Sequence, residues 1–401
     1  MSAPGARDRI GTNAGGMRQF VSGGLADEQV LPSYGRRSLA EVLPSIVAAQ
    51  GVPGFDNRIG LPEATRWVVL LVDGLGWHNL VSEPTAAPYL ASLADGAQPL
   101  TATVPSTTAT SLTSLGTGTG PGEHGMVGYS FRLPGAKGAV LNPLTWRLPH
   151  SPRTVQPLPT IFERVADEVR TVTVSLERFA ESGLTEAALR GPEFQGMWRE
   201  DNDDLRRDLI VTAATSAPRT LVYAYERRLD LFGHVEGWTT AVWREQLRSL
   251  DRACRELREA LPEDVALVVT ADHGMVDVPE SSVVIIEDDP ALAAGIDCVA
   301  GEGRFRQLYS DRESAHALAR RWAALLGNRA WVRTKDEAID EGWFGTVSDA
   351  ARARLGDVLV AARGDTAVMT RTLSQELALV GMHGSLTAAE MEVPLLVAVG
   401  R

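Results

Sequence analysis

Runs of apolar residues alternate along the chain with longer segments in which apolar residues recur at helical spacing. Six runs have the length and composition of buried strands: 66–72, 98–104, 169–176, 219–226, 265–271 and 393–400. Between them, apolar residues recur every three to four positions at 84–95, 106–115, 159–168, 203–215 and 239–260, which is typical of amphipathic helices. This alternation predicts an α/β fold with a mostly parallel central sheet and helices on both faces.

The same pattern of apolar and polar residues predicts that the chain is divided into three structural parts. Residues 1–60 combine a Gly-, Ser- and Arg-rich arm with a short amphipathic helix at 38–50. Residues 61–275 and 381–401 hold the alternating strands and helices and predict the main domain. The segment 276–380 breaks the alternation and contains one periodic helix near 313–327, so we expect it to form an inserted α+β subdomain.

Composition narrows the class of protein. The 39 Lys and Arg residues against 51 Asp and Glu give a net charge of −12, which argues against a nucleic-acid polymer as partner. No apolar run approaches the length of a membrane span, so we expect no membrane partner. Two cysteines, Cys254 and Cys298, are too few for a disulfide framework and favour free thiols in a cytoplasmic protein. The oligomeric state is left open.

Carboxylate and imidazole side chains accompany four of the predicted strands. Asp73 follows 66–72, Asp230 and His234 follow 219–226, Asp272 and His273 follow 265–271, and His383 precedes 393–400. Each has a structural explanation on its own, as a turn signal or a surface helix pair. Ligands of open parallel sheets bind at the carboxyl ends of strands, so the joint occurrence favours one shared site.

Aspartate oxygen and histidine nitrogen are ligands that zinc accepts readily. Six such side chains are too many for one tetrahedral ion and suit two. Two divalent ions roughly 3.5–4 Å apart can stabilise both the attacking and the leaving oxygen of a phosphoryl transfer. They would also supply the positive charge that a carboxylate such as Asp73 needs at the end of a buried strand.

A threonine-rich segment at 104–118, VPSTTATSLTSLGTG, contains a candidate nucleophile. The periodic apolar residues after Pro105 predict a helix that begins near Ser106, which places Thr108 in its first turn. Unpaired backbone N–H groups and the helix dipole favour an anion there. Coordination to a metal would lower the pKa of the threonine hydroxyl and activate it.

Taken in order, these residues resemble the alkaline phosphatase superfamily, and most closely its type I phosphodiesterase/nucleotide pyrophosphatase branch. The match spans 66–400 and includes Thr117-Gly118 nine residues after Thr108, then Pro121 and His124-Gly125. The resemblance implies a phosphodiesterase that works through a phospho-threonine intermediate. It also implies two zinc ions, one held by Asp73, Thr108, Asp272 and His273, the other by Asp230, His234 and His383.

Substrate contacts are less defined. The branch usually has a phosphate-contacting asparagine where this chain has Ser111, whose hydroxyl could still donate a hydrogen bond. Tyr129 and Trp238 could stack on a base or could pack in the core. We expect a small phosphate ester or a nucleotide as substrate. A phosphomonoesterase or phosphonate hydrolase of the same superfamily, and a non-catalytic binding protein that kept the fold, are the alternatives.

Overall fold

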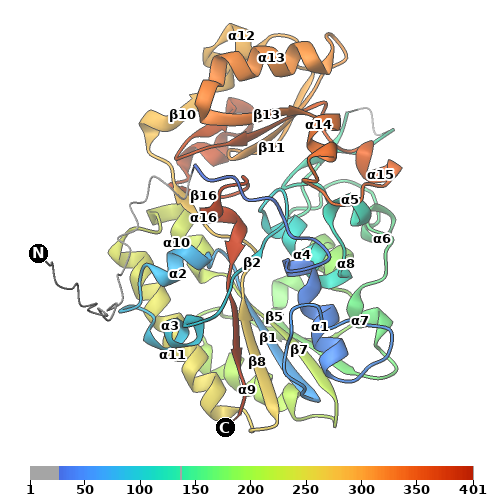
Figure 1. The fold of residues 1–401 in the computed structure, drawn as a ribbon, viewed down its shortest axis with the longest axis vertical. Coiled ribbons are helices and arrows are strands. Elements are labelled where there is room, and N and C mark those ends of the chain that lie inside the picture. Colours follow the sequence, from blue (N-terminus) through green and yellow to red (C-terminus); the bar gives the residue numbers. More distant parts are fainter. Residues whose placement is uncertain (1–26, 136–137, 401) are drawn as a thin grey trace, which may run out of the picture.

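The computed structural model describes residues 27–135 and 138–400. A six-stranded sheet forms its centre, in the order β18-β8-β1-β7-β5-β6 (Figure 1). The strands are β1 Arg66–Val72, β5 Arg170–Leu176, β6 Glu193–Met197, β7 Thr220–Glu226, β8 Val265–Thr270 and β18 Leu395–Ala398. All neighbours pair in parallel except β18, which runs antiparallel to β8 at one edge. The predicted α/β class with a mostly parallel sheet is confirmed.

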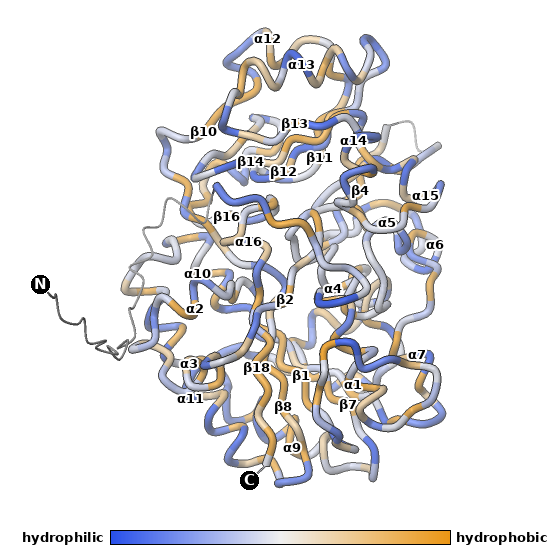
Figure 2. Tube along the Cα trace, in the orientation of Figure 1, coloured by the Kyte–Doolittle hydropathy of each residue, from blue (hydrophilic) through white to orange (hydrophobic). Residues whose placement is uncertain are grey.

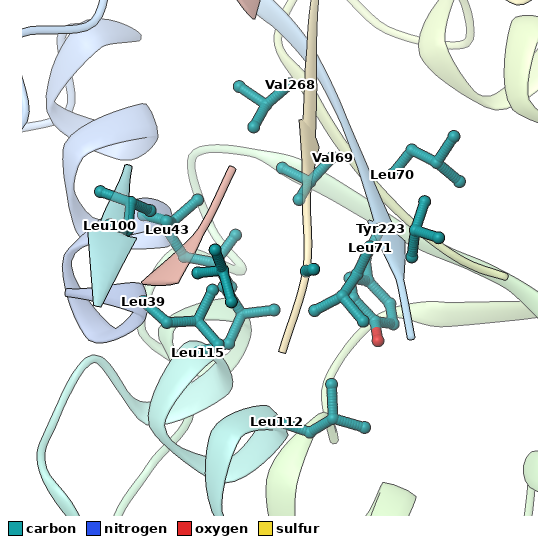
Figure 3. Packing of buried hydrophobic residues seen from close by; sticks show 14 of the residues in the cluster. Leu39, Leu43, Val69, Leu70, Leu71, Leu100, Leu112, Leu115, Tyr223 and Val268 are labelled. Carbon is teal, nitrogen blue, oxygen red and sulfur yellow. The ribbon is translucent and has the colours of Figure 1, made fainter. Parts of the chain in front are cut away.

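Both faces of the sheet are covered. Val69 and Leu71 of β1 point toward the side of the sheet where Leu39 and Leu115 lie, whereas Leu70 between them points to the opposite side (Figure 3). Successive side chains of a strand alternate between faces, so a strand buried throughout must be covered on both. The central strands accordingly form the most continuous hydrophobic part of the chain (Figure 2).

Most of the helices that cover the sheet lie close to predicted segments, whereas those at 183–188 and 228–236 lie outside them. They are α1 Val42–Ala49, α3 Pro88–Ala94, α4 Thr108–Thr117, α7 Ile161–Arg164, α8 Gly183–Ala188, α9 Asp203–Ala214, α10 Arg228–Glu236 and α11 Ala241–Ala260. Helix α9 packs against β1, β5, β6 and β7, and α11 packs against α9 and α10. Helix α7 is much shorter than the predicted 159–168, because its last turn gives way to the turn that leads into β5.

One strand prediction is wrong. Only Leu100–Thr101 (β2) of the segment 98–104 is extended and paired, and its partner is β17, Glu392–Val393, outside the central sheet. Pro105 has no N–H to donate, and the hydroxyl of Thr103 donates to its carbonyl, so the segment bends toward α4 instead. The sheet gains β6 in its place, whose half-buried residues gave no apolar run.

The segment 276–380 forms most of the upper part of Figure 1. It contains an antiparallel sheet in the order β11-β12-β14-β13, formed by Cys298–Glu302, Phe305–Tyr309, Val358–Ala362 and Ala330–Thr334. Helix α13, Ala315–Leu326, packs on β13 and β14 around Trp322. Phe305 and Leu359 belong instead to the main core. The boundaries predicted for this subdomain, and for the parts on either side, stay predictions.

The remaining elements are short. The helices are η1 Leu39–Glu41, α2 Trp77–Val81, α5 Pro121–His124, α6 Pro152–Val155, η2 Glu177–Phe179, η3 Glu280–Ser282, η4 Ile286–Asp288, α12 Pro290–Ala293, η5 Gly327–Arg329, α14 Lys335–Asp340, α15 Asp349–Arg352, η6 Arg371–Ala378 and α16 Ala388–Met391. The strands are β3 Phe131–Arg132, β4 Val140–Leu141, β9 Val276–Asp277, β10 Val283–Ile285, β15 Ala367–Met369 and β16 Gly381–Met382. Within the described residues, no helix is both long and apolar enough to cross a membrane.

Candidate active site

The predicted metal ligands meet above the carboxyl ends of the central strands. Asp73 directly follows β1, Asp272 and His273 follow β8, Asp230 and His234 lie on α10 after β7, and His383 follows β16. Ligand atoms of Asp73, Asp272 and His273 lie within 4.8 Å of one another, and so do those of Asp230, His273 and His383. Residues more than 300 positions apart in the sequence therefore form one cluster.

The three histidines of the cluster are oriented alike. In each, Nδ1 lies within hydrogen-bond distance of a backbone carbonyl: His234 to Gly381 at 2.7 Å, His383 to Ser106 at 2.9 Å and His273 to Gly274 at 3.0 Å. A carbonyl can only accept, so Nδ1 carries a proton, and in the neutral ring Nε2 keeps the lone pair that a cation needs. This arrangement is typical of histidines that bind a metal.

The free Nε2 atoms face the carboxylates. His234 and His383 place Nε2 at 3.3 Å and 3.8 Å from Asp230 Oδ1, and His273 Nε2 lies 3.3 Å from Asp73 Oδ1. The His273 and His383 rings stack with centroids 3.5 Å apart. His273 thus lies between the two predicted ligand sets, and the division of ligands between two ions stays a prediction.

His124 provides the contrast. It is buried outside the cluster, its Nδ1 accepts from the N–H of Met126 at 3.0 Å, and its Nε2 lies 2.9 Å from the Ser114 hydroxyl. Nδ1 is the acceptor here, so the tautomer is the reverse of that in the cluster. Burial, with a smaller effect of the Arg354 charge, lowers the pKa of His124 to about 3, so this ring is a neutral structural group.

Each aspartate of the cluster has one buried oxygen without a hydrogen bond: Asp73 Oδ1, Asp230 Oδ1 and Asp272 Oδ2. Other oxygens of the same groups are held, since the Tyr225 hydroxyl donates to Asp73 Oδ2 and the Gly74 N–H donates to Asp272 Oδ1 at 3.2 Å. Gly74 has φ +73°, and a Cβ there would lie 3.0 Å from Asp230, so glycine is needed at this position. Three carboxylate oxygens without hydrogen bonds, so close together, fit a bound cation.

Burial and the close approach of several carboxylates shift the pKa values of the cluster residues. Burial, and then the Asp73 charge, raise the pKa of Asp272 well above its usual value, and burial raises that of Asp230 to about 6. Burial alone would lower the pKa of His273, but Asp272 and Asp73 outweigh it and raise the value to about 10. Burial, and then the His273 charge, lower the pKa of His383 well below its usual value. A positive charge at the centre of the cluster would lower the raised pKa values of Asp230, Asp272 and His273, and so favour two carboxylates and a neutral ring.

Thr108 lies beside the cluster, at the first residue of α4. The helix begins there because Thr107 is extended, with φ −136°, and forms its N-cap. Thr108 Oγ1 lies 3.3 Å from His273 Nε2. The preceding Ser106 donates its hydroxyl to the Ser385 carbonyl at 2.7 Å, and its own carbonyl meets the His383 ring. The threonine turn and the loop that carries His383 therefore hold one another in place.

A cavity of about 480 Å³ opens beside Thr108. Its lining includes the predicted ligands Asp73, Asp230, His234 and His383, and extends away from them between α4, α8 and the sheet. From the 276–380 segment, Glu302 and Glu376 also line it. Burial, and then the Glu376 charge, raise the pKa of Glu302 well above its usual value. Neither glutamate was predicted, because no sequence signal connects the insert to the strand ends.

The sequence profile of the type I phosphodiesterase/nucleotide pyrophosphatase family matches residues 67–386. The chain belongs to this family. It is therefore a hydrolase of the phosphodiesterase/nucleotide pyrophosphatase type, and members of this family depend on metal ions. Among curated protein sequences, none matches the chain.

Solved structures of ectonucleotide pyrophosphatase/phosphodiesterase 5 share the fold. The murine protein has a TM-score of 0.67 and 17% identity, over 84% of this chain and 88% of that chain. An inactive threonine-to-alanine variant of it, in complex with AMP, gives a TM-score of 0.68 and 16% identity over the same shares. The human protein gives 0.67 and 16%, over 83% of this chain and 88% of that chain.

Three predicted substrate contacts of this phosphodiesterase have different surroundings. Tyr129 lines the cavity. Trp238 does not, and packs edge to face against Trp243 with ring centroids 6.1 Å apart. The prediction for Ser111 is corrected, because its buried hydroxyl donates to the Asp272 carbonyl at 2.8 Å and Ser111 does not line the cavity. Ser111 thus supports a ligand-bearing segment rather than a phosphate.

Proposed function

We propose that this chain hydrolyses small phosphodiesters with Thr108 as the nucleophile, through a phospho-threonine intermediate and with two bound divalent ions, zinc being the best match. The observation that carries the proposal is the set of three buried carboxylate oxygens without hydrogen bonds, which face three histidines that present a free Nε2. This donor set suits zinc, which accepts both oxygen and nitrogen.

The residues divide into two ligand sets. Asp73, Thr108, Asp272 and His273 would hold one ion, and Asp230, His234 and His383 the other. When bound, the ions would neutralise the carboxylates, lower the pKa of the Thr108 hydroxyl and offset the charge on the phosphate oxygens. The backbone carbonyls of Ser106, Gly274 and Gly381 keep the three rings in the orientation that this requires.

Thr108 Oγ1 attacks phosphorus, and the bond from phosphorus to the leaving oxygen breaks as the new bond forms. The leaving oxygen takes up the proton that the Thr108 hydroxyl loses. The first-turn N–H groups of α4 have no acceptor inside the helix and would donate to the phosphate. Water then attacks phosphorus, the bond from phosphorus to Thr108 Oγ1 breaks, and one proton of the water passes to Thr108 as the phosphate monoester is released.

The comparisons support this assignment of roles. The murine relative that binds AMP is an inactive threonine-to-alanine variant, which supports a threonine nucleophile here. Its complex with AMP also supports a small phosphate ester or nucleotide as the substrate.

The test compares Thr108→Ala with Thr110→Ala on bis(4-nitrophenyl) phosphate. Thr110 lies on the same helix and its buried hydroxyl has no hydrogen-bond partner, so it is a matched control. We expect Thr108→Ala to lower kcat by at least about 10³-fold. Its metal content, measured by plasma mass spectrometry, should stay close to that of the wild type. Acid-quenched wild-type enzyme should yield a peptide phosphorylated at Thr108, and a Thr108→Ala variant with wild-type rates would refute the assignment.

A further inference from the structure

The far end of the cavity lies on the sheet face beneath α4. Val69, Tyr223, Thr173 and Phe194 are register partners across β1, β7, β5 and β6, so their side chains share one face of the sheet. Tyr223, Thr173 and Phe194 line the cavity, and Ser175, two residues after Thr173, lines it further along β5. These residues form the floor of what we call the chamber.

The floor is hollow because β5 carries small residues on this face. Val172 and Val174 point to the opposite face and are fully buried, whereas Thr173 and Ser175 take the positions where a packed core would have large apolar side chains. Both hydroxyl residues are themselves buried, so they are not a solvent-exposed edge of the strand. The space that they leave is open to the active site.

Leucines form the roof. Leu112 lies one helical turn beyond Thr108 on the same side of α4, and Leu184 and Leu189 come from α8 and the residue after its end. Leu112 projects from α4 toward the sheet strand that carries Tyr223 (Figure 3). A substituent on a phosphate at Thr108 would therefore extend past Leu112 into the chamber.

Charge in the cavity selects against a second phosphate. Among the described residues that line it, the only Lys or Arg is Arg227, and Glu200 already accepts from its guanidinium at 2.7 Å. Two carboxylates outside the predicted ligands, Glu302 and Glu376, also face the cavity. Glu376 is paired with Arg306, but one oxygen of Glu302 is buried and has no hydrogen bond. Away from the proposed metal ions, a second phosphate would meet these carboxylates and no unpaired cationic side chain of the lining.

Resting on the proposed function, we propose that the chamber binds an uncharged, apolar alcohol arm of the substrate. The preferred substrate is then a monoanionic phosphodiester with an alkyl or similar apolar group, rather than a nucleotide with several phosphates. The buried Tyr223 hydroxyl has no hydrogen-bond partner and could donate to a single ester or ether oxygen of that arm. The chamber excludes water from the arm and so favours its burial.

The test measures binding first, so that it does not depend on turnover. Metal-loaded wild-type protein is titrated with methyl, butyl and hexyl phosphate by calorimetry. Burial of each methylene should tighten binding by up to about fourfold, so affinity should rise steeply along the series. Affinities that agree within about twofold across the three would overturn the chamber as an apolar site.

Hydrolysis is then measured with the 4-nitrophenyl esters of the same three alkyl phosphates and of thymidine 5′-phosphate. In these esters the 4-nitrophenolate leaves, and the alkyl phosphate stays on Thr108 until water releases it. We expect kcat/KM to be highest for the hexyl ester, and a higher value for the thymidine ester would overturn the inference. If no ester is hydrolysed while the affinity series still rises, the proposed function fails and the chamber stands.

Two variants of β5 test whether the alkyl group binds in the chamber. Thr173→Leu fills the chamber and should flatten the rise in affinity from methyl to hexyl phosphate. Thr171→Leu makes the same change two residues earlier on the same face of β5, outside the cavity, and should keep the rise. A slope that is equally steep in both variants would overturn the assignment of the chamber. The wild-type series remains decisive if either variant fails to fold.

Discussion

At one end of the cavity, carboxylates and imidazoles face one another with free oxygen and nitrogen atoms. At the other end, leucines and small hydroxyl residues surround a space on the sheet face. The two ends are joined by one helical turn of α4, from Thr108 to Leu112. The carboxylates of the first end need a positive charge near them, and the leucines of the second end favour contact with an apolar group.

This difference shows how one cavity can divide the work of an enzyme. The charged end depends on hydrogen bonds that fix each group, such as the three ring-to-carbonyl contacts of the histidines. The apolar end needs only shape and exclusion of water, so its residues have few specific partners. Changes at the charged end should therefore abolish chemistry, whereas changes at the apolar end should alter selectivity.

The largest loss of activity is expected for His383→Ala, and His124→Ala is its control. Removing His383 deletes a predicted ligand, so kcat should fall by more than about 10³-fold, since even one lost transition-state contact costs 10²–10³. Metal content measured by plasma mass spectrometry should fall as well. Turnover and metal content together report whether the histidine belongs to the charged end.

His124→Ala is the matched control, because His124 is equally buried but has the reverse tautomer. It should keep its metal and lose about 1–3 kcal/mol of unfolding free energy for each partner left without a hydrogen bond. Equal loss of metal in both variants would show that the cluster does not depend on ring orientation.

Removal of metal should have the next largest effect. A chelator returns three buried carboxylates to mutual repulsion, and at free metal concentrations of 100 to 1,000 times Kd the lost stabilisation is about 2.7–4.1 kcal/mol. Calorimetric melting with and without the chelator measures it. Asp251 is a buried aspartate outside the cluster, and its oxygens accept from the N–H groups of Leu90 and Tyr89. The control variant Asp251→Asn should therefore lose as much stability to the chelator as the wild type does. Asp272→Asn, which lacks a predicted ligand, should lose much less. A wild-type protein that is insensitive to the chelator would contradict a metal centre.

The charged end could be predicted from the sequence and the apolar end could not. Asp73, Asp272 and His273 directly follow apolar runs, and parallel strands bring their carboxyl ends to one edge, so order along the chain was enough. His383 precedes its strand instead of following one, so its place in the cluster rested on the joint pattern and on the resemblance to a family. The chamber depends on Thr173 and Ser175 sharing a face with Tyr223, which needs the register of β5 on β7.

The wrong sequence predictions have the same cause, because they depended on contacts between elements that the order of residues does not give. Ser111 is a polar residue near Thr108 in sequence, but helical geometry turns it toward the Asp272 carbonyl. The segment 98–104 is apolar enough for a strand, but Pro105 and the partner β17 determine its course. The roles of three other residues could not be predicted, because they come from contacts between elements far apart in the chain: Tyr225, Ser106 and Glu302.

The smallest expected effect comes from two tyrosines of β7, one at the charged end of the cavity and one at the apolar end. Tyr223 and Tyr225 lie on the same face of β7, but only Tyr225 donates to Asp73, while the Tyr223 hydroxyl has no partner. Tyr225→Phe should weaken metal binding by roughly 10- to 100-fold, because outer hydrogen bonds orient metal ligands. Competition with a colorimetric chelator measures this affinity. Tyr223→Phe should leave metal affinity and unfolding free energy at wild-type values, because it removes no hydrogen bond. If Tyr223→Phe weakened metal binding as much as Tyr225→Phe does, the two ends would not be separable, and the division of the cavity would be wrong.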